Sequence, residues 1–128
     1  MTMVFRKLHV VLLAASVSVV GCGSDVVSGV CLSYRGAGIS VDVRDSITNA
    51  LVGQGSIITA SDGIVADTSE YTPFGPGPYP LAYEMPGSFT VTVTQNGYQP
   101  WTKTGVLVTS TSDGCHVNVV SLTARLQK

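Results

Sequence analysis

The sequence predicts an all-β protein: a single β-sandwich of about seven strands with Greek-key-type connections, behind a helical signal peptide. From residue 22 onward the chain holds 14 Val, 5 Ile and 12 Thr against 6 Leu, and β-branched side chains favour strands. In the same part, short runs of alternating apolar and polar residues are separated by turn signals. A sustained apolar stripe of helical period is not found there.

We expect strands at residues 39–44, 55–60, 64–65, 81–85, 88–94, 101–108 and 116–126. The first strand alternates apolar and polar side chains, which is typical of a strand with one buried face. Residues 45–49 (DSITN) then have the short polar side chains of a turn. The second strand is closed by Ser61, Asp62 and Gly63, a strong turn signal, and the third strand is short.

Residues 71–80 form a loop rich in Pro, Gly and aromatic residues, which cannot lie in a central strand. The fifth strand has the clearest register, because a slip of one residue would bury every threonine of SFTVTVT. Asn96-Gly97 marks a tight turn before the sixth strand. In the last strand the apolar positions change parity at Val119 and Val120, which indicates a bulge or a change of the buried face.

The first 21 residues are typical of a secretory leader. Arg6 and Lys7 form a basic start, and residues 8–20 carry no formal charge. This apolar run is shorter than a membrane span of about 20 residues. We therefore divide the chain into a signal peptide at 1–21, a tether at 22–37 and a β-sandwich domain at 38–128.

Residues 19–22 (VVGC) resemble the bacterial lipobox. The resemblance implies that Cys22 is diacylated and becomes the new N-terminus, which would hold the protein to a membrane of the bacterial cell envelope. Stable anchoring needs more than one acyl chain, and a diacylglyceryl group meets that condition. Gly23 behind the cysteine implies the outer membrane. Ordinary secretion without a lipid is the alternative.

The chain has three cysteines, an odd number for an exported protein. If Cys22 carries lipid, Cys31 and Cys115 remain to form a disulfide, which an oxidising compartment permits. A thiol nucleophile formed by Cys115 and His116 is the alternative. Adjacent residues of a strand point to opposite faces, so that pair is badly placed for catalysis.

The order of the motifs resembles the carboxypeptidase regulatory-like, or prealbumin-like (transthyretin-like), β-sandwich family over about residues 38–126. The matching features are the alternating strand at 39–43, Asp45-x-x-Thr48, Asp62-Gly63, Gly87-Ser88-Phe89 and Asn96-Gly97-Tyr98. These are turn and core signatures, so the resemblance implies a fold and says little about activity. Enzymes related to this family need several histidines, whereas the chain beyond the leader holds only His116.

Composition and motifs argue against most chemistries. The net charge of the whole chain is -1 and 12% of its residues are charged, so we expect no nucleic-acid partner. We expect no cofactor and no metal, because Asp62, Asp67 and Glu70 lack the spacing of a calcium loop. A nucleophile elbow and a phosphate loop are also missing from the sequence. We therefore expect a non-enzymatic envelope protein with a structural or protein-interaction role.

The aromatic residues of two loops suggest a second function, a carbohydrate- or peptidoglycan-binding module. Exposed rings in loops can stack on a glycan or hold a peptide. The alternative is that Tyr98 and Trp101 cap one end of the core and that the Pro-rich loop packs on itself. The candidate ligand-binding residues are Tyr71, Phe74, Tyr79, Tyr98 and Trp101.

Overall fold

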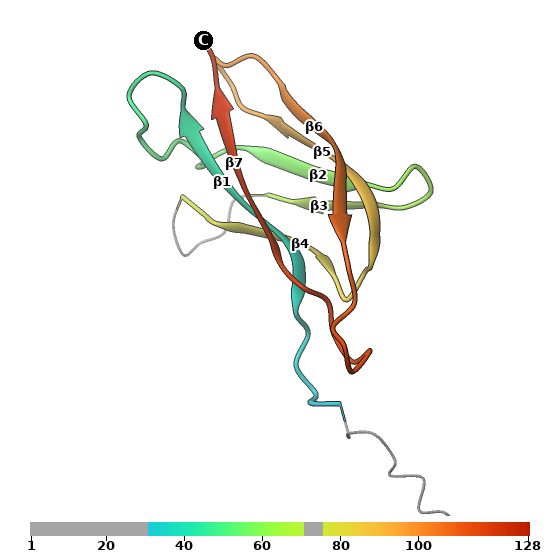
Figure 1. Cartoon of the computed structure of the whole chain (residues 1–128). Coiled ribbons are helices and arrows are strands. Elements are labelled where there is room, and N and C mark those ends of the chain that lie inside the picture. Colours follow the sequence, from blue (N-terminus) through green and yellow to red (C-terminus); the bar gives the residue numbers. More distant parts are fainter. Residues whose placement is uncertain (1–30, 71–75) are drawn as a thin grey trace, which may run out of the picture.

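The computed structural model describes residues 31–70 and 76–128, and these residues form an all-β sandwich (Figure 1). None of them lies in a helix long and apolar enough to cross a membrane. The strands are β1 (Ala37–Asp45), β2 (Ile57–Ser61), β3 (Ala66–Ser69), β4 (Tyr79–Tyr83), β5 (Gly87–Thr94), β6 (Trp101–Val108) and β7 (Val120–Leu126). The expected fold class is thereby confirmed.

The seven strands form two sheets, one of three strands in the order β4-β1-β7 and one of four in the order β3-β2-β5-β6. In the smaller sheet, β1 pairs antiparallel with β4 and parallel with β7. All pairs of the larger sheet are antiparallel. The chain crosses between the sheets in the connections β1–β2, β3–β4, β4–β5 and β6–β7, so neither sheet forms from one continuous stretch of sequence.

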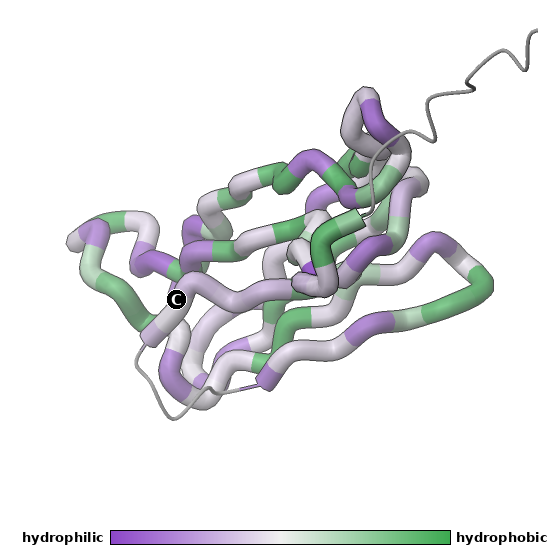
Figure 2. The backbone as a smooth tube through the Cα atoms, turned by 90° about the horizontal axis from the view of Figure 1, so that it is seen from below, coloured by the Kyte–Doolittle hydropathy of each residue, from purple (hydrophilic) through white to green (hydrophobic). Residues whose placement is uncertain are grey.

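The core consists of the inward-facing residues of alternate strand positions, as the period-two pattern requires. Figure 2 shows hydrophobic and hydrophilic residues following one another along the backbone. From β1 these are Ile39, Val41 and Val43, all with no exposed surface. From β5 they are Phe89, Val91 and Val93, at most 1% exposed. The predicted register of both strands is therefore confirmed, because each buries its alternating apolar side chains and, of the polar ones, only Asp45 at the end of β1 is buried.

Threonines occupy the outer face of the larger sheet. Thr59 lies opposite Thr68 of β3 on one side and opposite Thr92 of β5 on the other. Thr92 in turn pairs with Thr102 of β6, so one row of threonines crosses all four strands. A β-branched side chain with a hydroxyl suits a pleated surface that faces water.

The third and fourth strands lie elsewhere than their sequence pattern indicated. The third is not at residues 64–65, because Ile64 and Val65 belong to the turn after β2; Ile64 is 93% exposed. The fourth begins at Tyr79 rather than at residue 81. Pro80 is accommodated there because β4 is an edge strand of its sheet.

The last strand is shorter than expected. It begins at Val120, and Val117 makes only an isolated bridge to Ser110. The parity switch that the sequence shows at Val119 and Val120 thus coincides with the start of the strand. Val119 faces out and is 58% exposed, whereas Ala124 and Leu126 point into the core.

The buried Asp45 ties the β1–β2 turn to another part of the chain. One carboxylate oxygen accepts hydrogen bonds from the backbone N–H groups of Ile47 (2.9 Å) and Thr48 (2.8 Å). The other accepts a hydrogen bond from the hydroxyl of Tyr98 (3.1 Å). The N–H groups of Thr48 and Ile47, together with the Tyr98 hydroxyl, lower the pKa of Asp45 to about 2. The turn predicted at residues 45–49 is present.

Two neighbouring isoleucines of β2 test the register of the larger sheet. Ile58 has no exposed surface, whereas Ile57 is 48% exposed. We expect Ile58→Ala to lower the free energy of unfolding by about 2–4 kcal/mol, because it leaves a cavity in the core. The matched control, Ile57→Ala, should cost less than about 1 kcal/mol. Denaturant titrations of both variants measure this, and equal losses would contradict the register.

Candidate functional site

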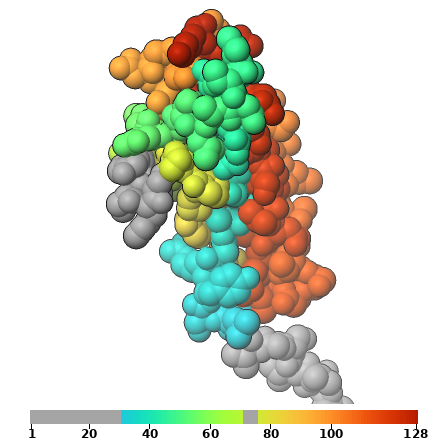
Figure 3. All heavy atoms as spheres, turned by 90° about the vertical axis from the view of Figure 1, so that its left-hand side faces the viewer, coloured from blue at the N-terminus to red at the C-terminus, as the bar shows by residue number. Residues whose placement is uncertain are grey.

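A disulfide fastens the segment in front of β1, residues 31–36, to the body of the domain. Cys31 is bonded to Cys115, with 5.3 Å between their Cα atoms and 84 positions between them in the sequence. Cys115 lies in the β6–β7 connection. The blue-green start of the described chain and the orange-red β6–β7 connection lie side by side at one end of the molecule (Figure 3). The disulfide expected from the sequence is confirmed.

Glu84 and His116 form a second tie at the same end. His116 Nδ1 lies 2.9 Å from Glu84 Oε1, and the same carboxylate oxygen accepts a hydrogen bond from the backbone N–H of Gly36. The Gly36 N–H and, after it, the His116 ring lower the pKa of the Glu84 carboxyl. Glu84 therefore joins the segment before β1 to the residue that follows Cys115.

Tyr34 completes this cluster. Its ring stacks on the His116 ring, with 4.5 Å between the centroids and 29° between the planes. Beside it, the Arg35 guanidinium lies 5.9 Å from the centroid of the Tyr83 ring. Tyr34 remains 59% exposed although it is held in place on one side. The result is an aromatic ring that faces solvent in a defined position.

The geometry gives His116 a structural role. Nδ1 is engaged by Glu84, and Nε2 is buried with no hydrogen-bond partner among the described residues. Neither nitrogen is placed to exchange a proton with a substrate. Cys115 is held in the disulfide, so the thiol and imidazole pair considered from the sequence does not exist as a nucleophile and base.

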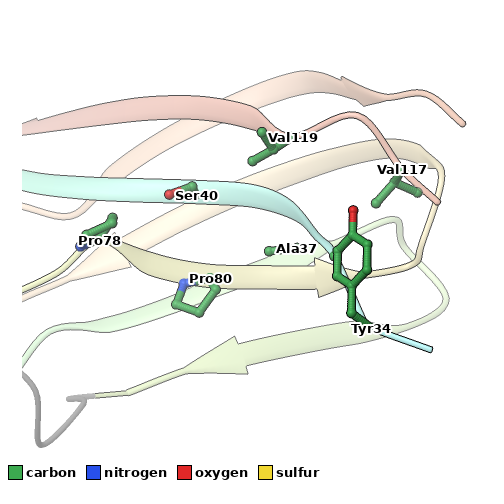
Figure 4. A pocket seen from close by; sticks show the side chains of 8 residues that line it. Tyr34, Ala37, Ser40, Pro78, Pro80, Val117 and Val119 are labelled. Carbon is green, nitrogen blue, oxygen red and sulfur yellow. The ribbon is translucent and has the colours of Figure 1, made fainter. Parts of the chain in front are cut away.

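An apolar groove lies beside this cluster, on the outer face of the β4-β1-β7 sheet (Figure 4). Its volume is about 500 Å³, within the range of binding sites for small ligands and peptide side chains. Tyr34 and Val117 lie at one end and Pro78 at the other. Its lining consists of Tyr34, Gly36, Ala37, Ser40, Pro78, Pro80, Val117 and Val119.

The structure does not bring the predicted ligand-binding aromatics together. Tyr79 has no exposed surface and lies in the core, so the expectation of an exposed ring there is wrong. The residue is the first of β4, where inward-facing positions are buried. Tyr98 and Trp101 both follow the Asn96-Gly97 turn and are half-buried against the core. Tyr71 and Phe74 lie outside the described residues.

Two of the three carboxylates considered for calcium, Asp62 and Asp67, are used within the fold. Asp62 accepts hydrogen bonds from the backbone N–H groups of Ile64 and Val65, both at 2.8 Å, and so closes the β2–β3 turn. Asp67 accepts a hydrogen bond from the backbone N–H of Ala82 at 2.7 Å, which links β3 to β4. Within residues 31–70 and 76–128, no group of three or more His, Cys, Asp or Glu side chains could hold a metal ion.

Sequence reasoning missed Tyr34 and Glu84. Tyr34 lies three positions after Cys31, so the predicted disulfide was the available signal that its neighbourhood is fixed. Glu84 gave no signal, because its partners Gly36 and His116 are 48 and 32 positions away.

Comparison with known proteins adds no relative: no protein-family model matches the chain, and no curated protein is significantly similar to it.

The disulfide can be tested by stability. We expect the double variant Cys31→Ser, Cys115→Ser to lose about 4 kcal/mol of unfolding free energy, because the bond closes a long loop in the unfolded chain. Denaturant titration measures the loss, and wild type under reducing conditions should match the variant. Two free thiols on these residues in the non-reduced protein, detected by alkylation and mass spectrometry, would contradict the bond.

The Glu84 cluster predicts a contribution to acid sensitivity. The folded pKa of Glu84 lies below its ordinary value, so its stabilising effect is complete above the pKa of the unfolded chain. The effect is lost as the pH falls through the lowered folded pKa. We expect Glu84→Gln to be less stable than wild type at neutral pH and to lose less stability on acidification. Unfolding free energies measured from pH 7 to pH 3 would contradict this if the two curves ran parallel.

Proposed function

We propose that the protein is a lipid-anchored protein of the bacterial cell envelope whose β-sandwich is not catalytic and serves a structural or protein-interaction role. The observation that carries the proposal is the motif Val-Val-Gly-Cys at residues 19–22, behind a basic start and a short apolar run. Cys22 is the acylated residue of this proposal, and it lies outside the described residues.

The cysteine pairing supports this assignment. The structure uses Cys31 and Cys115 in one disulfide, which leaves Cys22 as the third cysteine of the chain. Structural disulfides persist in oxidising compartments, so the bond favours a protein that is exported. Gly23 behind Cys22 favours the outer membrane as the destination in this proposal.

The non-catalytic role is supported by what the reactive side chains do. Cys115 is oxidised to the disulfide and both nitrogens of His116 are enclosed or engaged. The competing proposal of glycan binding has less support, because Tyr79 is in the core and Tyr98 and Trp101 pack against it. We further propose a relation to the carboxypeptidase regulatory-like sandwiches, which the two-sheet architecture supports at the level of fold alone.

The anchor is testable at one residue. We expect Cys22→Ala, or treatment of producing cells with globomycin, to leave the precursor uncleaved, because lipoprotein signal peptidase requires an acylated cysteine. Cys31→Ala is the matched control and should be processed normally. Mass spectrometry of the mature protein should find a diacylglyceryl group on Cys22. An unmodified mature N-terminus and unchanged membrane fractionation of Cys22→Ala would contradict the proposal.

A further inference from the structure

A small polar pocket lies at the end of the sandwich where β1 and β7 finish, opposite to the disulfide (Figure 1). The end of β7 has β1 on one side and the segment before β6 on the other. The Leu126 carbonyl oxygen accepts a hydrogen bond from the Ser46 N–H, and the Gln127 carbonyl oxygen accepts one from the Gln99 N–H. We call this cavity of about 110 Å³ the terminal pocket; it is lined by Gln99, Pro100, Trp101, Arg125 and Gln127.

Cationic side chains gather at this end of the molecule. Arg44 and Arg125 are register partners on β1 and β7, and both face away from the core. The Lys128 ammonium lies 5.6 Å from the centroid of the Tyr98 ring. Among the described lysines and arginines only Arg44 forms an ion pair, with Asp42 at 3.5 Å. Like charges side by side on neighbouring strands destabilise a sheet, and Asp42 offsets only one of the two arginines.

Asn49 holds both arginines in position. Its backbone oxygen accepts a hydrogen bond from Arg44 Nη1 and its side-chain Oδ1 accepts one from Arg125 Nη1, both at 3.0 Å. Its φ is 60°, a left-handed conformation that asparagine tolerates better than most residues. Within residues 31–70 and 76–128, Oδ1 is the one acceptor that Arg125 has, so the other donors of its guanidinium remain for a ligand.

The two carboxylates of β1 at this end do not compete for Arg125. Asp42 is paired with Arg44. Asp45 is only 7% exposed, and its carboxylate already accepts three hydrogen bonds, one of them from Tyr98. The terminal pocket, as the described residues form it, has no acidic side chain in its lining. An anion in the pocket would therefore meet positive charge without a carboxylate that repels it at close range.

We propose that the terminal pocket binds a carboxylate group carried by a short apolar substituent. The planar fork of a guanidinium pairs with a carboxylate through two parallel hydrogen bonds, and Arg125 supplies that fork. The side-chain amides of Gln99 and Gln127 have N–H groups to add. Gln99 is free to turn, because its amide makes only one long contact, 3.5 Å, with the Lys128 backbone oxygen. The site goes beyond the proposed anchoring role and does not depend on it.

The size and the walls of the pocket select the ligand. A cavity of about 110 Å³ is smaller than the usual site of a drug-sized molecule, so it takes one polar group and a few carbons rather than a nucleotide or an oligosaccharide. Phosphate also matches a guanidinium, but Trp101 and Pro100 offer apolar surface that only an organic acid can use. A free acid and the C-terminal residue of a peptide share this chemistry.

Trp101 is the only tryptophan of the chain, so its fluorescence reports on this pocket alone. We expect N-acetylalanine to change the fluorescence of the full-length protein, as isolated from cells, in a saturable way at constant ionic strength. N-acetylalaninamide has nearly the same shape without the charge and should have no such effect. Tighter binding of N-acetyl-trialanine would assign the ligand to a peptide end, and equal binding would assign it to a free acid.

Three variants test the residues. Arg125→Gln should weaken the binding of N-acetylalanine about ten-fold, because charge-assisted hydrogen bonds are lost. Asn49→Gly suits the left-handed backbone and removes only the oxygen that orients Arg125, so we expect a smaller loss and an unchanged circular dichroism spectrum. Arg35→Gln is the matched control. It makes the same change at an exposed arginine near the disulfide and should bind like wild type.

Any of four results would overturn the proposal: no saturable change with N-acetylalanine, equal effects of the acid and its amide, equal losses in Arg125→Gln and Arg35→Gln, or tighter binding of inorganic phosphate than of the acid. The comparison of acid and amide uses the wild-type protein, so it decides even where a variant does not fold. Cys22→Ala should bind N-acetylalanine like wild type, so a failed anchor and a failed pocket give different results.

Discussion

The structure depends on one strand, β1, which holds the three-stranded sheet together. Its antiparallel neighbour β4 and its parallel neighbour β7 do not pair with each other, so each is attached to the sheet through β1 alone. The inward-facing side chains of Ile39, Val41 and Val43 have no exposed surface. Gly38, which has no side chain, leaves room for β4 and β6 to come close to β1. A Cβ atom at Gly38 would lie 2.8 Å from both the Ala82 carbonyl oxygen and Val108 Cγ1. Burial on one face and the close approach of both β4 and, in the other sheet, β6 together fix where β1 can lie.

How well the sequence predicted each element follows from whether its pattern was local. In β1 and β5, apolar and polar residues alternate strictly, and the structure has both strands in the expected register. The start of β4 was predicted two residues too late, because the proline content around Tyr79 and Pro80 outweighed the apolar pattern. Proline rules out a central strand but is tolerated at an edge, and a single sequence does not say which strands are edges.

The same distinction applies to the candidate site. The disulfide could be inferred from a count of cysteines and the leader, which are properties of the sequence itself. The Tyr34, Glu84 and His116 cluster joins residues from three separate parts of the chain through stacking and hydrogen bonds. Such contacts leave no spacing or periodicity behind, so the groove beside them could not have been found without the arrangement of the strands.

The position of the disulfide also determines how the domain would respond to mechanical load. Under the proposed function, the polypeptide before Cys31 connects the domain to a membrane, so any tension enters there. Tension between the two termini passes across the sulfur–sulfur bond to Cys115, and the 84-position loop between the cysteines is bypassed. The residues after Cys115, which include β7, lie outside this covalent shortcut and could be pulled straight. Most of the sandwich would therefore stay folded under a force that extends its C-terminal strand.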